Sequence, residues 1–364
     1  MTIPTIDGIQ GLATSGTEVT SFSTHVFTKI RRDGMRKSMQ SILGILTGTA
    51  IAATTMLGVA MAKPGNTECI APAGAGGGWD FTCRVPAAQV MGDMGLIDGT
   101  MAVTNMSGAG GGKAYAHVVT KRGDDENLIV AASMATAARL GQNVYSGFKA
   151  SDVRWVGALG ADYGAIAVHK DSEFKTLGDL VTAMRDNPRR TAIVGGSSAG
   201  GWDHLKVLIV ADKAGISDLK AINYISFDNG GTAMLEILSK RADAFTGDIS
   251  ELVEYEKQGN IRILAILAPD RIPAVPSAKT AKEQGYDVIG ANWRGFYVPK
   301  NISDARYNEW VDIVTKVANS SQWADLSAKN GLAPFASFGK DFENFVGGQI
   351  GKVAQISTDL GFMK

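Results

Sequence analysis

Cysteine and histidine, the residues most used for metal binding and redox chemistry, are scarce in this chain of 364 residues. It contains two cysteines and four histidines. The two cysteines and the three scattered histidines beyond residue 62 form no zinc-binding pattern. The sequence therefore predicts no metal site and no cofactor.

An excess of charge of either sign is also absent. Lysine and arginine together number 36, as do aspartate and glutamate. Proteins that bind nucleic acids usually carry a basic patch or stripe. The even balance therefore predicts that nucleic acid is not a partner.

Long uncharged runs are absent except near the N-terminus, at Ser38–Met61. This run ends in Ala60-Met61-Ala62, which fits a small-x-small cleavage pattern. We interpret residues 35–62 as a signal peptide cleaved after Ala62, and residues 1–34 as an extension outside the functional protein. The run is long enough for a membrane anchor, but its Ala, Gly and Thr content favours removal. A basic group precedes it: Arg31, Arg32, Arg36 and Lys37.

The part beyond residue 62 has no second run of this kind. It carries 31 basic and 33 acidic residues. We therefore expect a slightly acidic, soluble protein in the periplasm.

Both cysteines, Cys69 and Cys83, lie in the part that is expected to be exported. An oxidising compartment favours a disulfide between them, and two buried thiols are the alternative. A disulfide would close a short loop around the first glycine cluster and stabilise the fold by roughly 3 kcal/mol.

Beyond Lys63, short runs rich in β-branched residues alternate with helical patterns. This alternation is typical of parallel sheets covered by helices on both faces, and it predicts an α/β fold. The expected strands are Glu68–Pro72, Met101–Asn105, Leu128–Ala132, Val153–Leu159, Ala165–His169, Thr191–Val194, Ile222–Ser226, Ala242–Thr246 and Arg262–Leu267. The expected helices are Trp79–Met91, Lys113–Thr120, Thr176–Asp186, Trp202–Ala214, Thr232–Ser239, Ser250–Gln258, Ser303–Ser320, Gln322–Asn330 and Lys340–Leu360.

Glycine is abundant, with 44 residues. Four runs of small residues each join a predicted strand to a predicted helix. The first turn of a helix leaves backbone N–H groups without partners, and glycine lets an anion approach them closely. One such run would be explained by a tight turn, but four indicate an anion-binding cleft at the carboxyl ends of the strands. The runs are Ala73–Gly78, Ser107–Gly112, Gly195–Gly201 and Asp228–Gly231.

The segment Gly196-Ser197-Ser198-Ala199-Gly200 matches the G-x-S-x-G turn that presents the nucleophile of many serine hydrolases. The catalytic histidine of such enzymes follows the serine and an acid along the chain. Here no histidine follows His204, which lies in the helix directly after the turn. We therefore expect no enzyme, and keep a hydrolase with Ser198 as nucleophile as a remote alternative.

Residues 107–114 resemble a nucleotide-binding P-loop, but they lack its leading glycine and the Ser or Thr that should follow Lys113. Neither early glycine cluster completes G-x-G-x-x-G, because Trp79 and Lys113 occupy the third glycine position. The sequence therefore does not predict nucleotide binding.

The run from Glu68 to Arg84, ECIAPAGAGGGWDFTCR, closely resembles the opening of the solute receptors of tripartite tricarboxylate transporters (TctC or Bug-like). Residues 106–111 resemble a second motif of that family, with Ser107 in place of the usual proline. The resemblance extends over nearly all of the chain beyond residue 62. Further segments are similar to the tricarboxylate-binding branch: Asp152–Trp155, Asp162–Gly164, Ala281–Tyr286 and Arg294–Val298.

This resemblance implies a two-lobed periplasmic binding protein, type II-like, in which each lobe is a mostly parallel sheet flanked by helices and the ligand lies in the interlobe cleft. It implies one lobe of residues 63–162 with about 268–364, and a second of 163–267. The implied partners are citrate or a related tricarboxylate and the membrane subunits of the transporter. We expect a monomer. A dicarboxylate or aromatic acid, or a sensing role with a two-component system, remains an alternative.

By position, the resemblance also implies the ligand-binding residues. Tyr163 lies where the chain first crosses between lobes, and a packed hinge aromatic is its alternative role. Arg84 is expected to form a structural ion pair, and Arg294 is a candidate cation of the cleft. The implied ligand-binding residues are Ala75, Gly76, Gly77, Gly78, Asp80, Gly108, Gly110, Gly111, Gly112, Tyr163, Ser197, Ser198, Ala199, Gly200 and Asp248.

Overall fold

A computed structural model describes residues 62–361, and these belong to one compact unit. The predicted signal peptide, the extension before it and the basic group therefore lie outside the described residues, apart from Ala62. No helix in the described part is both long and apolar enough to cross a membrane.

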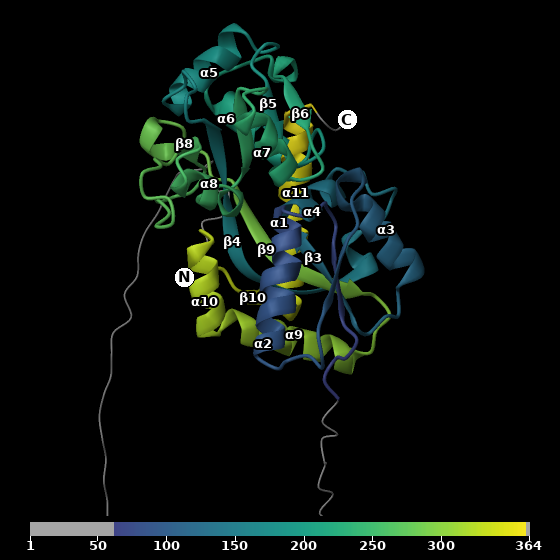
Figure 1. Cartoon of the computed structure of the whole chain (residues 1–364). Coiled ribbons are helices and arrows are strands. Elements are labelled where there is room, and N and C mark those ends of the chain that lie inside the picture. The colour runs from purple at the N-terminus through teal and green to yellow at the C-terminus, as the bar shows by residue number, and fades with distance from the viewer. Residues whose placement is uncertain (1–61, 362–364) are drawn as a thin grey trace, which may run out of the picture. The chain divides into compact units, whose positions relative to one another are not determined.

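Helices cover a mixed sheet of ten strands (Figure 1). Its main path runs β2-β1-β3-β9-β4-β7-β5-β6, and β8 and β10 pair with β4 beside this path. The strands are β1 (Glu68–Ala71), β2 (Ala102–Asn105), β3 (Leu128–Ser133), β4 (Val153–His169), β5 (Ile193–Gly195), β6 (Tyr224–Ser226), β7 (Ala244–Asp248), β8 (Ile261–Ile266), β9 (Ala291–Pro299) and β10 (Ser337–Phe338).

The outer strands are parallel and the central ones antiparallel. β1 runs parallel to β2 and β3, and β5 runs parallel to β6 and β7. β9 is antiparallel to β3 and β4, and β4 is antiparallel to β7, β8 and β10. The parallel strands of one side thus adjoin β9 through β3, and those of the other side adjoin β4 through β7.

Strand β4 joins two groups of strands, which form the two lobes. Its residues 153–163 pair with β9, whereas residues 164–169 pair with β7 and β8. In Figure 1, β4 and β9 run from the lower group of elements to the upper group, which contains β5, β6 and α5–α7. The first lobe is defined here by β1–β3, β9 and the first part of β4, and the second by β5–β8 and the remainder of β4.

The prediction of two separate strands, Val153–Leu159 and Ala165–His169, is wrong, because β4 is continuous over 17 residues. Glycines usually weaken a strand interior, which is why the sequence suggested a break. Close packing compensates here. A Cβ on Gly157 would lie 2.7 Å from the ring of Phe338, and one on Gly164 would lie 2.5 Å from the Lys206 side chain.

The helix predicted at Trp79–Met91 forms, but with an irregular centre. It begins as α1 (Gly78–Thr82), continues as a π-helical segment at Cys83–Val90, and ends as α2 (Met91–Asp93). Pro86 lies within the segment and has no N–H to donate to the preceding turn. The remaining helices are α3 (Gly112–Lys121), α4 (Met134–Gly141), α5 (Leu177–Asp186), α6 (Trp202–Lys213), α7 (Gly230–Leu238), α8 (Val253–Lys257), α9 (Asp304–Ala318), α10 (Ser321–Lys329) and α11 (Gly339–Asp359).

Helix α4 and strand β9 were not assigned from the sequence pattern. Ser133 caps the N-terminus of α4: its hydroxyl accepts a hydrogen bond from the Ala135 N–H, and Thr136 completes a capping box. Thr136 occupies the position where Glu or Gln is usual in such a box, so the sequence signal was weak. Both elements border the cavity described below.

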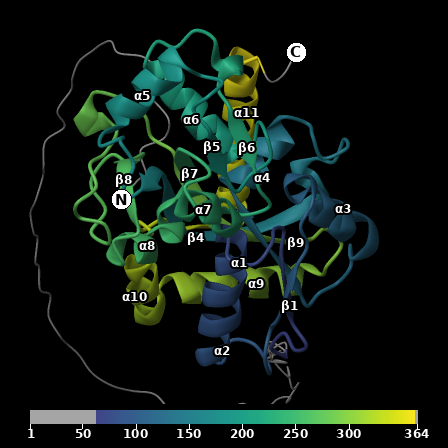
Figure 2. The same ribbon diagram turned by 45° about the horizontal axis from the view of Figure 1, so that its top comes forward.

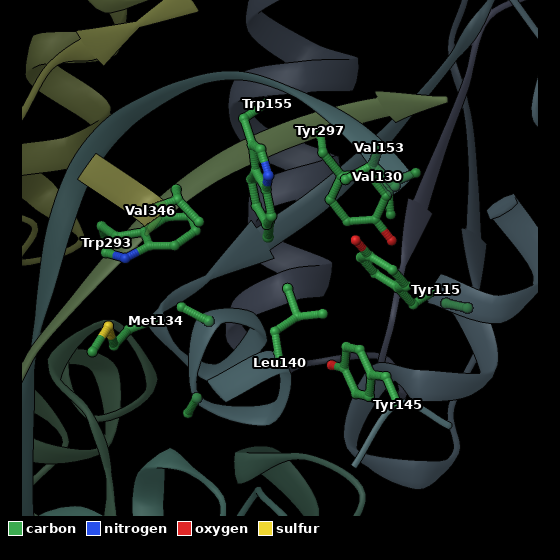
Figure 3. Packing of buried hydrophobic residues seen from close by; sticks show 14 of the residues in the cluster. Tyr115, Val130, Met134, Leu140, Tyr145, Val153, Trp155, Trp293, Tyr297 and Val346 are labelled. Atoms are coloured by element: carbon green, nitrogen blue, oxygen red, sulfur yellow. The ribbon is translucent and has the colours of Figure 1, made fainter. Parts of the chain in front are cut away.

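An aromatic cluster packs α4 and α11 against the sheet. Trp155 meets Trp293 edge-on at 6.2 Å and Tyr297 at 5.6 Å between ring centroids, and Trp293 meets Phe342 at 5.1 Å. Figure 3 shows these rings of β4 and β9 facing the apolar residues of α4. Figure 2 shows α11 lying alongside α4 from a second direction. The cluster therefore fixes α4, which contributes a charged side chain to the cavity.

Cys69 and Cys83 form a disulfide, with 5.6 Å between their Cα atoms. Both side chains are fully buried. The bond connects β1 to the helix that follows the first glycine run, and so closes the loop that contains this run.

Candidate functional site

A cavity of about 80 Å³ lies where the four glycine-containing loops meet. Its wall includes residues from the loops after β1, β2, β5 and β6, together with residues of α4, α6, β7 and β9. A water molecule needs about 10–15 Å³ of such space. The cavity is therefore large enough for a small polar molecule, and both lobes contribute to it.

Glycine is required at this wall because the loops approach each other closely. A Cβ on Gly77 would lie 3.0 Å from the Cβ of Asn229, which belongs to another loop of the wall. One on Gly78 would lie within 2.3 Å of the Arg294 guanidinium, and one on Gly196 would lie 2.3 Å from the Gly230 nitrogen. Larger residues at these positions would separate the loops.

Several backbone N–H groups at the wall have no acceptor within the described part of the chain. They come from the loops after β1, β2, β5 and β6, so donors of both lobes converge. Unpaired N–H groups at the beginning of helices attract anions. The six residues are Gly77, Gly78, Gly110, Ser197, Ser198 and Gly230.

Of the residues predicted from the sequence, one group lines this cavity and another does not. The lining group consists of Gly77, Gly78, Gly108, Gly110, Gly111, Ser197, Ser198 and Asp248. The residues that lie outside the wall are Ala75, Gly76, Asp80, Gly112, Tyr163, Ala199 and Gly200.

Asp80 does not line the cavity but stabilises the first glycine run, Ala73–Gly78, by hydrogen bonds. Its carboxylate accepts hydrogen bonds from the Gly76 N–H at 3.0 Å, from Arg84 at 2.9 Å and from Asn105 at 2.9 Å. Burial acts to raise the pKa of Asp80, but the hydrogen bonds from Arg84, Gly76 and Asn105 outweigh it and keep the pKa below its ordinary value. The predicted structural ion pair of Arg84 is confirmed.

Tyr163 and the end of the lobe-two loop occupy supporting positions. Tyr163 is 4% exposed and packs in the apolar cluster of the second lobe. The Gly200 carbonyl accepts a hydrogen bond from Gln142 at 2.7 Å, and the Ala199 carbonyl accepts one from Arg139 at 3.2 Å. These two bonds connect α4 and the residue that follows it, in the first lobe, to the loop of the second.

Arg139 was missed by the sequence analysis, although its side chain lines the cavity. It lies in α4, the helix that the pattern did not reveal. Only 8% of the residue is exposed, and burial lowers its pKa below the ordinary value. An arginine within the small-residue stretch of residues 133–141 is the one local feature that could have indicated it.

Arg294 lines the cavity as the sequence analysis suggested, but its charge is already matched. Its Nη2 lies 2.7 Å from Asp162 and 2.8 Å from Asp248. Asn292 also donates to Asp248, at 2.6 Å. Asp248 thus serves to hold neighbouring side chains in addition to facing the cavity.

Glu251 faces the cavity beside this ionic cluster. Its Oε2 accepts a hydrogen bond from the Asp248 N–H at 3.1 Å, and its Oε1 has no partner among residues 62–361. Burial, followed by the charges of Asp248 and Asp203, raises the pKa of Glu251 to about 8. At neutral pH the carboxyl group is therefore mostly protonated and can donate a hydrogen bond into the cavity.

The Ser198 hydroxyl makes no hydrogen bond to a described residue. His204 Nδ1 accepts a hydrogen bond from the Gly200 N–H at 2.9 Å, and its ring stacks on Tyr224 at 4.4 Å. Burial, with a smaller contribution from Arg139, lowers the pKa of His204 to about 4.

Solved structures of other proteins share this two-lobed α/β fold. MatC of Rhodopseudomonas palustris with bound malate superposes with a TM-score of 0.69 at 17% identity, covering 80% of this chain and 98% of MatC. R. palustris Rpa4515 with adipate gives a TM-score of 0.73 at 19% identity, covering 82% and 97%.

The family described as tripartite tricarboxylate transporter family receptor matches residues 88–362, and the chain belongs to this family. The curated protein BugT of Bordetella pertussis (strain Tohama I) is 23% identical over 326 residues, covering 88% of this chain and 97% of BugT. Receptors of this family bind small carboxylates and act with the membrane components of a transporter.

Proposed function

We propose that this protein captures citrate or a related tricarboxylate in the periplasm and delivers it to the membrane subunits of a tripartite tricarboxylate transporter. The observation that carries the proposal is the convergence of six unpartnered backbone N–H groups on one cavity. Such groups bind carboxylate oxygens without requiring a cluster of cationic side chains.

The energy of such a site is sufficient for a receptor. A hydrogen bond to a charged group contributes about 1.5–3 kcal/mol before ordering costs. About six of them, less the free energy of association and closure, leave about −8 kcal/mol, which corresponds to a micromolar dissociation constant. We expect the protein to act as a monomer without catalysis.

Closure over the ligand requires lobes that move relative to each other. We propose residues 63–162 with about 268–364 as one lobe and 163–267 as the other. The change of β4 partners between Tyr163 and Gly164 supports this division. Export requires the signal peptide at residues 35–62, with cleavage after Ala62, as the sequence predicts.

The choice of ligand is open to a direct test. MatC with malate and Rpa4515 with adipate are structures with dicarboxylates, which supports a dicarboxylate as the second candidate. We expect citrate to raise the melting temperature of the mature protein in a thermal-shift panel with isocitrate, aconitate, malate, adipate and benzoate. A larger shift with malate or adipate would replace citrate, and no shift with any acid would contradict the proposed function.

Transport and sensing use the same type of clamp, and pull-down experiments separate them. Ligand-loaded protein should bind the membrane subunits of the transporter in detergent, and should not bind a sensor kinase. The remote alternative, a hydrolase, predicts ester cleavage that Ser198→Ala removes. Absence of cleavage of p-nitrophenyl acetate by the parent protein would eliminate it.

A further inference from the structure

Three arginines are buried in the described part of the chain: Arg139, Arg294 and Arg306. Arg294 contacts two carboxylates, and Arg306 pairs with Glu309 at 2.7 Å. Arg139 has no carboxylate of residues 62–361 within ion-pair distance. Its positive charge is thus buried without a counter-ion in the structure.

The hydrogen bonds of Arg139 go to neutral acceptors. Nη1 donates to Gln142 Oε1 at 2.9 Å and Nη2 donates to the Ala199 carbonyl at 3.2 Å. Nε donates to no described residue. Burying a charge without a partner is strongly unfavourable, so the arrangement is readily explained if an anion from outside the chain completes it.

The unused donor of Arg139 lies at a defined place on the cavity wall. A Cβ on Gly110 would lie 2.9 Å from Arg139 Nε and 3.1 Å from Ser198 Oγ. The Ser198 hydroxyl has no partner in the described chain, and neither do the N–H groups of Gly110 and Ser198. The Arg139 guanidinium and the Ser198 hydroxyl therefore both lie close to Gly110.

The other charged groups of the cavity wall are acidic or already paired. Asp203 and Asp248 line the wall, and the cations beside them, Lys206 and Arg294, already pair with carboxylates. A ligand carboxylate placed beside Asp203 and Asp248 would approach acidic groups. One placed at Gly110 would approach an uncompensated cation.

We propose that Arg139 is the charge partner of a ligand carboxylate that binds against Gly110 and Ser198. The inference rests on the proposed function and deepens it, because it assigns the orientation of the ligand. Arg139 belongs to α4 of the first lobe, whereas Ser198 and Ala199 belong to the second. The carboxylate therefore connects the lobes as well as neutralising the guanidinium.

Calorimetric titration with citrate, malate and adipate tests this, on wild-type protein and on Arg139→Gln, Arg139→Lys and Arg185→Gln. Arg185 is the matched control, since it also donates to a single backbone carbonyl, that of Ala214, but at the surface. For the acid that binds wild type most tightly, Arg139→Gln should weaken binding on the order of 10- to 100-fold. Arg139→Lys should lose less, because it keeps the charge but not the planar fork. Arg185→Gln should bind as wild type does.

The ligand-free melting temperature is the second readout, and it does not depend on any acid being bound. If Arg139 awaits an anion, Arg139→Gln removes an uncompensated charge and melts no lower than wild type. Unchanged affinity in Arg139→Gln, or a melting temperature several degrees below wild type, overturns the inference. If wild type binds none of the acids, the proposed function fails and the role of Arg139 in ligand binding fails with it. If wild type binds but Arg139→Gln binds equally well, only the role of Arg139 fails.

Discussion

Lys206 Nζ lies 2.7 Å from Asp248 Oδ1, and neither side chain is more than 5% exposed. Lys206 comes from α6, behind the loop that contains Ser198, and Asp248 ends β7 at the cavity. Burial raises the pKa of Asp248, but Lys206 and Arg294 outweigh it and hold the pKa below its ordinary value. The ion pair thus belongs to a network of buried charges that holds this part of the cavity wall in place.

Removing the charge of Asp248 should destabilise the fold. Asp248→Asn leaves Lys206 with Asp203 alone and Arg294 with Asp162 alone, so two buried cations lose a partner. Breaking buried pairs typically costs about 3–5 kcal/mol, and we expect a loss of this size in urea unfolding monitored by tryptophan fluorescence. Asp325→Asn, on the exposed face of α10, is the control and should unfold like wild type. A loss below about 1 kcal/mol would show that the network is not needed.

Glu251 should make stability depend on pH. Its folded pKa of about 8 lies above the ordinary value of about 4.3, so between these values the folded protein holds a proton that the unfolded chain has released. The contribution of Glu251 to the free energy of unfolding is then greatest below about pH 4.3 and decreases as the pH rises to about 8. Because the group faces the cavity, we expect a contribution of about 2 kcal/mol, less than the full shift implies.

Glu251→Gln isolates this effect. The difference in unfolding free energy between the variant and wild type, measured in urea at pH 5, 6.5 and 8, should increase with pH in favour of the variant. A constant difference across this range would mean that Glu251 is already ionised in the folded protein.

A side chain at Gly77 should prevent the loops from meeting. A Cβ there would lie 3.0 Å from the Asn229 Cβ, and the branches of valine would extend further. Gly77 has an extended backbone, so Gly77→Val should fold normally yet bind its ligand at least 10-fold more weakly, for a loss of about 1.4 kcal/mol. Gly348→Val is the matched control, because a Cβ at Gly348 meets nothing within 4 Å. Equal thermal shifts for the two variants with the best-binding acid would show that Gly77 does not belong to the binding site.

The disulfide should stabilise the folded state. Cys69 and Cys83 are 14 positions apart, and closing a loop of that length stabilises a protein by about 3 kcal/mol on the chain-entropy model. We expect the double variant Cys69→Ala, Cys83→Ala to lose about this amount in guanidinium unfolding. In that variant, adding dithiothreitol should change nothing further, whereas it should lower the stability of wild type. Identical unfolding curves for wild type with and without reductant would show that the disulfide does not stabilise the folded state.

Local features of the sequence were enough to predict the glycine loops and the helices that follow them. Runs such as Ala73–Gly78 combine a turn with a helix start, and the structure brings Gly77, Gly110 and Ser198 of three such runs to one cavity. Their meeting was expected because loops that follow parallel strands lie at the same edge of a sheet, although the strand order itself was not predicted. The continuous β4 was not predictable in this way, because the packing of Phe338 and Lys206 against its glycines comes from distant parts of the chain.

The charged side chains of the site were harder to predict from the sequence than the glycine loops. Arg139 lies in a helix that has an unusual cap, and Glu251 was placed in the predicted helix Ser250–Gln258 without a role of its own. Their roles depend on which charges lie nearby in space: Asp248 and Asp203 near Glu251, and no carboxylate near Arg139. Sequence spacing contains no information on these distances.

A crystal structure of the mature protein with its best-binding acid tests the central claim most directly. The account predicts carboxylate oxygens about 2.7–3.2 Å from the backbone nitrogens of Gly110 and Ser198, with Arg139 Nε donating to the same carboxylate. A ligand bound away from these loops, with the same N–H groups turned toward protein acceptors, would contradict it.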